Sequence, residues 1–281
     1  MQRAREERKQ EQGAQEEVKM KMENTAAGMP AAEAGTPATT AGTANPETIP
    51  LVVARDLAKR FGRVDAVNGI TVEIPRGQIV GLVGPNGSGK STFLKLIAGL
   101  LRPDRGEILV AGRRPGLATK RLVAYEPEGD CLYDWMTVQQ IMEFVAVQVP
   151  DWDSDKARSL LSFLNLREQL ATRIRNLSNG MRARVKLLIT LSRNAPLTLL
   201  DEPLSGIDPT SRLRIIQSLV SEFRLGEQTI ILSTHEVAET EGIFDRVIFL
   251  EKGQIKIDGD AQELRARYGC SIQRIFEEVY A

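Results

Sequence analysis

One stretch of nine residues, GPNGSGKST at Gly84–Thr92, constrains the fold of this 281-residue chain more than any other. The apolar run QIVGLVG leads into it and STFLKLIAGLL follows it, so we expect a buried strand, a tight loop and a helix in succession. The spacing G-x-x-x-x-G-K-[ST] in this context predicts a loop whose backbone N–H groups face phosphate. An accidental glycine-rich turn is the alternative, which the flanking strand and helix disfavour.

The residue types of this loop suit the phosphates of a nucleotide. Its glycines let the backbone curl, and the Lys90 ammonium can reach the β- and γ-phosphate oxygens. The Ser91 hydroxyl is suited to Mg²⁺, and Thr92 can hold the α-phosphate. The residues expected to contact nucleotide here are Gly84, Pro85, Asn86, Gly87, Ser88, Gly89, Lys90, Ser91 and Thr92.

Two later apolar runs, LTLLDEP and TIILSTHE, end in polar residues that we expect at the same edge of a sheet. Asp201 is suited to hold Mg²⁺ through water, and Glu202 to orient and activate an attacking water. His235, the single histidine of the chain, is suited to contact the γ-phosphate. We therefore expect Glu202, His235 and Lys90 to be catalytic. A surface acid pair and a structural histidine are the alternatives.

A second helix start occurs at LSNGMRARVK, Leu177–Lys186. A small polar cap, a glycine and nearby positive charge again suit a phosphate at a helix N-terminus, although a capped helix alone would look the same. The arginines around it (Arg173, Arg175, Arg182 and Arg184) suggest a solvated helix face rather than a nucleic-acid surface. The whole chain is neutral, with 37 basic and 37 acidic residues, so no nucleic-acid partner is expected.

The motifs GPNGSGKST, LSNGM, LTLLDEP, SGID and STHE stand in the order typical of the ATP-binding subunits of ABC transporters. The chain resembles that family over about residues 50 to 280. The resemblance implies an α/β fold, a P-loop NTPase cassette: a mostly parallel sheet core, an N-terminal antiparallel β part and a helical subdomain inserted at about 130–194. It also implies ATP hydrolysis coupled to transport, with ATP and Mg²⁺ as cofactors.

In this family two subunits pair head to tail around two ATP molecules, as a homodimer or as two different cassettes. The resemblance implies that Ser178 and Gly180 contact the ATP of the other subunit. It places Asp208, with Ser205 and Gly206, in a loop that crosses the dimer interface. A plain turn before the helix that Pro209 starts is the alternative.

The resemblance assigns further residues. It puts Phe61 of KRFG where an aromatic ring stacks on adenine, with an ordinary core phenylalanine as the alternative. Glu128 replaces the usual glutamine that binds Mg²⁺ or the water; we expect a working variant, with weakened coupling to the helical subdomain as the alternative. Asn179 and Met181 also depart from the family's LSGGQ, which puts the tightness of subunit closure in doubt.

The resemblance also implies a multi-span membrane protein as a partner. No apolar run here approaches the ~18 residues of a membrane span, so another chain would have to supply the membrane part. The chain is accordingly expected at the cytoplasmic face of the membrane. LYDWMTV resembles the segment that presents a groove to that partner, so Tyr133, Trp135 and Met136 are candidate contacts; core packing is the alternative. The cysteines, Cys131 and Cys270, are expected to be reduced thiols.

Residues 1–48 are expected to be a disordered low-complexity tail, because they hold too little apolar surface to offset the entropy of ordering. The ATP-binding domain is then expected over 49–281. The ending SIQRIFEEVYA resembles that of cassettes serving exporters, so export is the expected direction. A soluble ABC ATPase acting on ribosomes or DNA is the main alternative, although such relatives usually carry two cassettes. A P-loop kinase would leave LSNGM and STHE unexplained.

Overall fold

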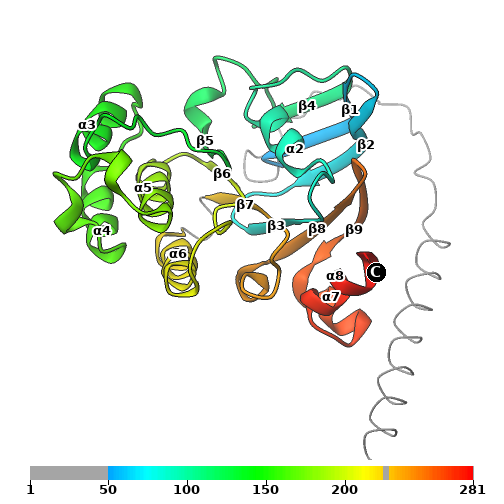
Figure 1. The fold of residues 1–281 in the computed structure, drawn as a ribbon. Helices are drawn as coiled ribbons and strands as arrows, with labels where there is room; N and C mark the ends of the chain where they lie inside the picture. The colour runs from blue at the N-terminus through cyan, green and yellow to red at the C-terminus, as the bar shows by residue number, and fades with distance from the viewer. Residues whose placement is uncertain (1–49, 224–227, 281) are drawn as a thin grey trace, which may run out of the picture.

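The structure, a computed structural model, describes residues 50–223 and 228–280 and contains two sheets (Figure 1). The expected tail at 1–48 lies outside the described residues. The longer helices and strands, in chain order, are β1 (Val52–Phe61), β2 (Val64–Ile74), β3 (Ile79–Val83), α2 (Lys90–Ile97), β4 (Arg105–Val110), β5 (Val123–Glu126), α3 (Val138–Gln148), α4 (Ser154–Phe163), α5 (Asn179–Leu191), β6 (Leu197–Asp201), α6 (Pro209–Glu222), β7 (Thr229–Thr234), β8 (Arg246–Glu251), β9 (Gln254–Asp260), α7 (Ala261–Tyr268) and α8 (Ile272–Tyr280).

The larger sheet has six strands in the order β5-β6-β7-β3-β8-β9. Neighbours from β5 to β8 run parallel, and only β9 pairs antiparallel. Strands β3, β6 and β7 are buried along their whole length, as expected for central strands of a sheet covered on both faces. Their carboxyl ends meet at one edge, where Asp201 pairs in register with Ser233. The predicted α/β fold with a mostly parallel core is confirmed.

The core divides into two clusters because side chains alternate between the faces of each strand. On β3, Ile79 and Val83 belong to the cluster that contains α5 and α6, whereas Val80 and Leu82 belong to the cluster that contains α2. The second cluster also includes the inner face of the smaller sheet. Helix α2 is therefore enclosed between the two sheets, with Phe93 fully buried, and the loop before it is held from both sides.

The smaller sheet is antiparallel, in the order β2-β1-β4, as predicted for the N-terminal part. The predicted helix STFLKLIAGLL is shorter than expected, because α2 ends at Ile97. Gly99 adopts φ +71°, the left-handed conformation that commonly terminates helices, so the apolar residues Leu100 and Leu101 lie beyond the helix.

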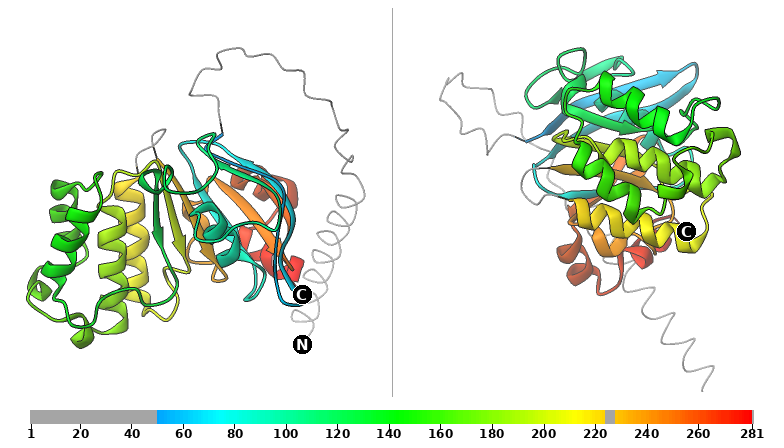
Figure 2. Two further views of the ribbon diagram at one scale, coloured as in Figure 1. Left: turned by 90° about the horizontal axis from the view of Figure 1, so that it is seen from above. Right: turned by 90° about the vertical axis from the view of Figure 1, so that its left-hand side faces the viewer.

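Helices α3, α4 and α5 lie between β5 and β6 in sequence and form a block beside the larger sheet, at the side opposite the antiparallel strands (Figures 1 and 2). Helix α6 packs next to α5. The chain returns through α8, where the Tyr280 ring stacks on Phe249 and its hydroxyl donates to the Leu250 carbonyl at 2.9 Å.

Candidate active site

The glycine-rich loop lies between the end of β3 and the start of α2, and its geometry suits an anion. Gly89 has φ +108°, and a Cβ there would lie 2.1 Å from the Ala66 carbonyl oxygen, so only glycine fits. No side chain caps α2, which leaves its first N–H groups and the positive end of its dipole facing the loop. The Ser88 hydroxyl is buried without a hydrogen-bond partner among the described residues. These donors fit the phosphates of a nucleotide.

The loop borders a cavity of about 340 Å³. The lining brings the loop together with two of the predicted acidic residues, which come from elsewhere in the chain. The residues around the cavity are Val64, Ala66, Asn86, Gly87, Ser88, Gly89, Lys90, Ser91, Thr92, Glu128 and Glu202. Phe61, at the end of β1, does not line it but is 49% exposed, which excludes the core-packing alternative for this ring.

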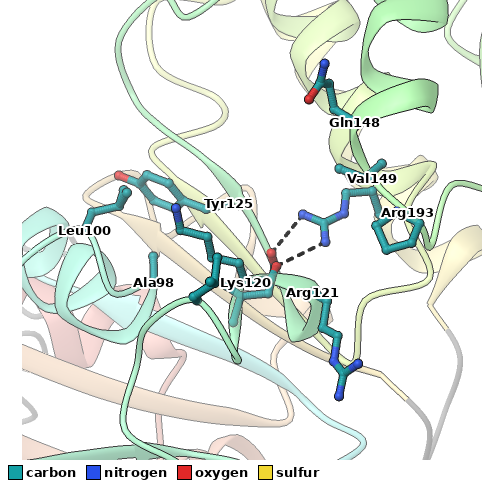
Figure 3. A pocket seen from close by; sticks show the side chains of 11 residues that line it. Ala98, Leu100, Lys120, Arg121, Tyr125, Gln148, Val149 and Arg193 are labelled. Carbon is teal, nitrogen blue, oxygen red and sulfur yellow. Dashed lines mark hydrogen bonds between the residues drawn. The ribbon is translucent and has the colours of Figure 1, made fainter.

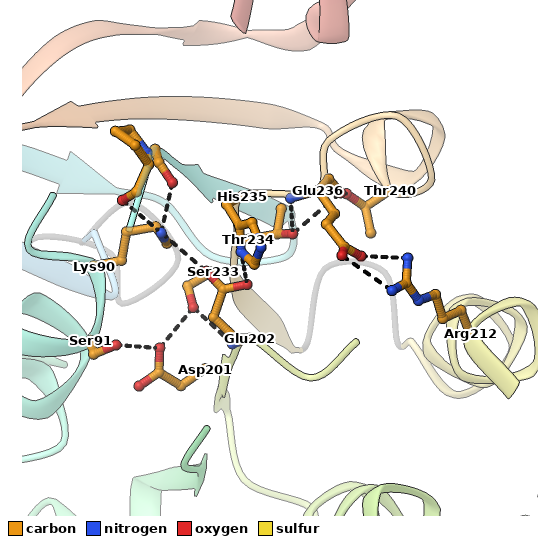
Figure 4. A network of polar contacts seen from close by, with 12 residues as sticks. Lys90, Ser91, Asp201, Glu202, Arg212, Ser233, Thr234, His235, Glu236 and Thr240 are labelled. Atoms are coloured by element: carbon orange, nitrogen blue, oxygen red, sulfur yellow. Dashed lines mark hydrogen bonds and ion pairs between the residues drawn. The ribbon is translucent and has the colours of Figure 1, made fainter. Parts of the chain in front are cut away.

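Asp201 is a buried carboxylate at the end of β6 that accepts three hydrogen bonds. They come from the hydroxyls of Ser91 at 3.0 Å, Ser233 at 2.8 Å and Tyr125 at 3.2 Å. Burial and the Asp201 charge raise the pKa of Tyr125, which keeps that phenol protonated as a donor. Asp201 is thereby fixed beside Ser91, at the same edge as the phosphate loop (Figure 4).

The oxygen atoms around this edge suit Mg²⁺. The Ser91 hydroxyl, the Asp201 carboxylate and Glu128 are hard oxygen donors. Within residues 50–223 and 228–280, no three or more histidine, cysteine, aspartate or glutamate side chains cluster into a metal site. A hydroxyl and two carboxylates suit an ion that also takes phosphate and water as ligands, as Mg²⁺ commonly does.

Glu202 follows Asp201 and is oriented by contacts on both sides. Its backbone, at φ +50°, donates to the Ser233 hydroxyl at 2.9 Å. Its carboxylate lies 3.0 Å from Lys90 Nζ and 2.9 Å from His235 Nδ1 (Figure 4). The predicted catalytic residues Glu202, Lys90 and His235 thus converge in a pocket where the carboxylate is almost fully buried and electrostatic contacts are strong.

A polar network that sequence reasoning missed lies behind His235. Arg212, on α6, donates to the Ile207 carbonyl at 2.7 Å, to Glu236 at 3.1 Å and to Glu239 at 3.0 Å. It joins the loop before α6 to the segment that carries His235 (Figure 4). An arginine in the first turns of a predicted helix gives no local signal for these distant partners.

The second helix start lies apart from this pocket. Ser178 caps α5, accepting from the Met181 N–H at 3.3 Å, and Asp208 caps α6, accepting from the Ser211 N–H at 3.0 Å. Hydrogen bonds from Ser211, through its side chain and its backbone N–H, lower the pKa of Asp208. A Cβ on Gly180 would lie 3.2 Å from Asp208 Oδ2, so the two capped starts are adjacent. The structure gathers Ser178, Gly180 and Asp208 at one place and the phosphate-loop residues at another.

The predicted solvated face for the arginines of α5 is wrong for Arg184. This residue is only 9% exposed and donates to the carbonyls of Gly180 and Leu164. Arg182 is partly covered and pairs with Asp130 and Asp134. The prediction failed because helix packing, not charge alone, decides which side chains reach water; Arg173 and Arg175, outside the helix, are exposed.

A groove of about 460 Å³ lies between the end of α2, strand β5 and the end of α3 (Figure 3). Leu100, 57% exposed, and Leu117, 86% exposed, contribute to its rim. Tyr133 and Trp135 lie in the segment just before α3 and are exposed, and the Tyr133 ring contacts Phe144 of α3. Met136, in the same segment, packs against the core. The core-packing alternative therefore holds for Met136 and not for the two aromatic residues.

Comparison with known proteins identifies the family. A model of the ABC transporter family matches residues 67–205. The chain is 32% identical to the uncharacterized ABC transporter ATP-binding protein YxlF of Bacillus subtilis, over 77% of this chain and 73% of that protein. The chain belongs to the ATP-binding subunits of ABC transporters. It is an ABC-type ATPase domain that binds ATP, as the motifs predicted.

The chain is also similar to transport proteins whose names differ in cargo. The aliphatic sulfonates import ATP-binding protein SsuB of Zymomonas mobilis is 37% identical over 75% of this chain and 86% of that protein. The chain spans only 13% of the organic anion transporter ABCA8A of Mus musculus, at 32% identity over 73% of this chain.

A solved ATP-binding subunit of an ABC transporter superimposes with a TM-score of 0.73 at 28% identity, covering 82% of this chain and all of the other. In the described parts of this chain, no helix has the length and apolar character needed to cross a membrane.

Proposed function

We propose that this chain hydrolyses ATP as one of two paired subunits and drives a separate membrane protein. The observation that carries the proposal is the convergence of Lys90, Glu202 and His235 beside the phosphate loop. Lys90 binds the β- and γ-phosphates, Glu202 accepts a proton from the attacking water, and His235 orients Glu202 and contacts the γ-phosphate. The remaining loop residues hold the phosphates, and Phe61 stacks on the adenine.

We also propose that Mg²⁺ binds with the ATP, because oxygen donors line this edge of the sheet. Ser91, Asp201 and Glu128 would hold the ion, which neutralises phosphate charge when bound. Tyr125 and Ser233 keep the Asp201 carboxylate in place for that role. Glu128, where an amide is usual in the family, supplies a negative oxygen at the same cavity.

The pairing of two subunits follows from the separation of the two helix starts. Ser178, Gly180 and Asp208 do not line the cavity of their own phosphate loop, so a second copy or a related cassette would bring them to it. ATP then contacts both subunits and favours the closed pair, and its hydrolysis removes that preference. Helices α3 to α5 serve as the helical subdomain that carries Ser178 to the interface.

The membrane partner is proposed to contact the groove beside α3 and the exposed rings of Tyr133 and Trp135. Large exposed apolar side chains close together are typical of protein-interaction sites. The chain would then act at the cytoplasmic face of the membrane. Export is the direction that we propose, on the resemblance of SIQRIFEEVYA to exporter cassettes; the relative SsuB is named for import.

Glu202→Gln tests the proposal. The amide cannot accept the proton, so hydrolysis should fall by about 100-fold or more, while ATP binding persists. At saturating ATP the variant should form a stable dimer, measured by light scattering after size exclusion. Adding Lys90→Ala to the same chain should abolish both ATP binding and the dimer. A Glu202→Gln chain that stays monomeric at saturating ATP would refute the paired mechanism.

A further inference from the structure

Two charged side chains are buried where α5 packs on the end of β5. Lys186, on α5, is 9% exposed, and Glu126, the last residue of β5, is 1% exposed. A buried ammonium is unfavourable unless its three N–H donors are paired. The partners of Lys186 therefore show what its burial accomplishes.

The Lys186 ammonium donates to three successive backbone carbonyls. They belong to Pro127 at 2.9 Å, Glu128 at 3.2 Å and Gly129 at 3.3 Å. Glu126 Oε1 lies 3.9 Å from the same nitrogen, and neither carboxylate oxygen of Glu126 has a hydrogen-bond partner among the described residues. One cation thus pairs with three successive backbone carbonyls and also lies beside a buried carboxyl group.

The loop that Lys186 holds, residues 127–129, borders the cavity at the phosphate loop. Its central residue, Glu128, lines the phosphate cavity together with Lys90 and Ser91. The helix that supplies Lys186 begins immediately after Ser178, which caps it. Because three consecutive carbonyls converge on one nitrogen, the backbone on both sides of Glu128 is fixed relative to α5.

We propose that Lys186 is a positioning residue: it sets where the Glu128 carboxylate stands in the phosphate cavity and links that position to helix α5. The inference rests on the proposed role of Glu128 toward Mg²⁺. A displacement of α5 would carry the loop 127–129 with it, so the Mg²⁺ site of one subunit would respond to the helix that contacts the ATP of the other.

The test measures ATP affinity by titration calorimetry, with and without Mg²⁺, in full chains that also carry Glu202→Gln and so do not hydrolyse ATP. Lys186→Met and Glu128→Ala should each reduce the Mg²⁺-dependent gain in affinity roughly tenfold, the range seen when a residue that orients a metal ligand is removed. The affinity without Mg²⁺ should not change, because the phosphate loop is intact. Combining both substitutions should be no worse than Glu128→Ala alone.

Loss of folding is separated by a second variant. Lys186→Met leaves the Glu126 carboxyl buried without its cation, and adding Glu126→Leu replaces that carboxyl with an apolar side chain, which should recover part of the lost melting temperature. The Mg²⁺-dependent gain should stay reduced, because the carbonyls of 127–129 still lack their donor. Arg246→Met is the matched control: Arg246 bonds the Glu73 carbonyl and Asp258 at the opposite end of the sheet, and its loss should lower stability without touching the gain.

Each outcome of the calorimetry supports or overturns the role of Lys186. A full Mg²⁺-dependent gain in Lys186→Met, with a reduced gain in Glu128→Ala, would overturn the inference and leave the proposed function standing. A full gain in both would remove Glu128 from the Mg²⁺ site, and the inference with it. Effects that multiply in the double variant, or a gain that recovers together with the melting temperature, would show that Lys186 acts on folding or elsewhere.

Discussion

Glu126 carries a carboxyl group whose buried environment changes its chemistry. Burial raises its pKa from 4.5 to about 8, and the Lys186 ammonium opposes that rise. The folded state therefore keeps this proton over a pH range in which the unfolded chain has lost it. The stability contributed by Glu126 is fully present below about pH 4.5 and is lost as the pH rises through about 8.

Glu126→Gln should remove this dependence, because the amide stays neutral at every pH. We expect equal free energies of unfolding for the two chains near about pH 5 and an advantage of a few kcal/mol for the variant near about pH 9. Urea titrations at both pH values, without nucleotide or Mg²⁺, measure the difference. A difference that is constant across the range would show that Glu126 is already ionised in the folded protein.

At the scale of elements, Arg212 connects two loops by hydrogen bonds and so fixes their relative position. Arg212→Met should lower the rate of ATP hydrolysis about tenfold, because the segment carrying His235 and the loop at Ile207 lose a shared anchor and small misplacements of catalytic groups are costly. ATP affinity should change less than about twofold, since the phosphate loop is not involved. Steady-state kinetics and a nucleotide titration separate the two.

Glu239→Gln is the comparison for that experiment. It removes only the negative charge of the more exposed partner of Arg212 and leaves Glu236 and Ile207 in place, so the rate should remain near that of the unchanged chain. Equal losses in the two variants, or a loss of affinity that matches the loss of rate, would argue for a general weakening of α6.

The strand ends could be predicted because each is encoded locally. Asp201 and His235 follow uninterrupted apolar runs, and a parallel sheet brings such ends together. Lys186 could not be placed in this way: its partners are 57 to 59 residues away and depend on how α5 packs on β5. The one local signal was a lysine within the apolar run VKLLITL. Arg184 was predicted wrongly for a similar reason: its Gly180 partner lies one turn earlier on the same helix, but the Leu164 carbonyl reaches it only through packing.

At the scale of the whole molecule, the separated helix starts predict that two defective chains can repair each other. Lys90→Ala removes the phosphate lysine. Ser178→Asp keeps the cap of α5, because aspartate also caps helices, but sets a negative charge against the γ-phosphate of the partner. In a head-to-tail pair of these two chains, one site carries both defects and the other carries none.

Each variant alone should be inactive. An equal mixture should recover ATP hydrolysis, up to about a quarter of the rate of the unchanged chain, because half of randomly formed pairs hold one intact site of two. A colorimetric phosphate assay on the mixture measures this rate. No recovery, with pairing verified by light scattering, would mean that each chain uses its own Ser178.

The left-handed backbone conformation of Glu202 bears on which substitutions selection for stability would favour. A non-glycine residue at φ +50° is held there by the Ser233 contacts at a cost to folding, and glycine at this position would relieve that strain. The same carboxylate also pairs with the buried ammonium of Lys90, so glycine would exchange backbone strain for a buried charge without its partner, and folding would gain nothing from the loss. A library of this chain screened only for heat tolerance would therefore be expected to keep an acid at position 202, so that selection for folding alone would preserve the group that the proposed reaction uses.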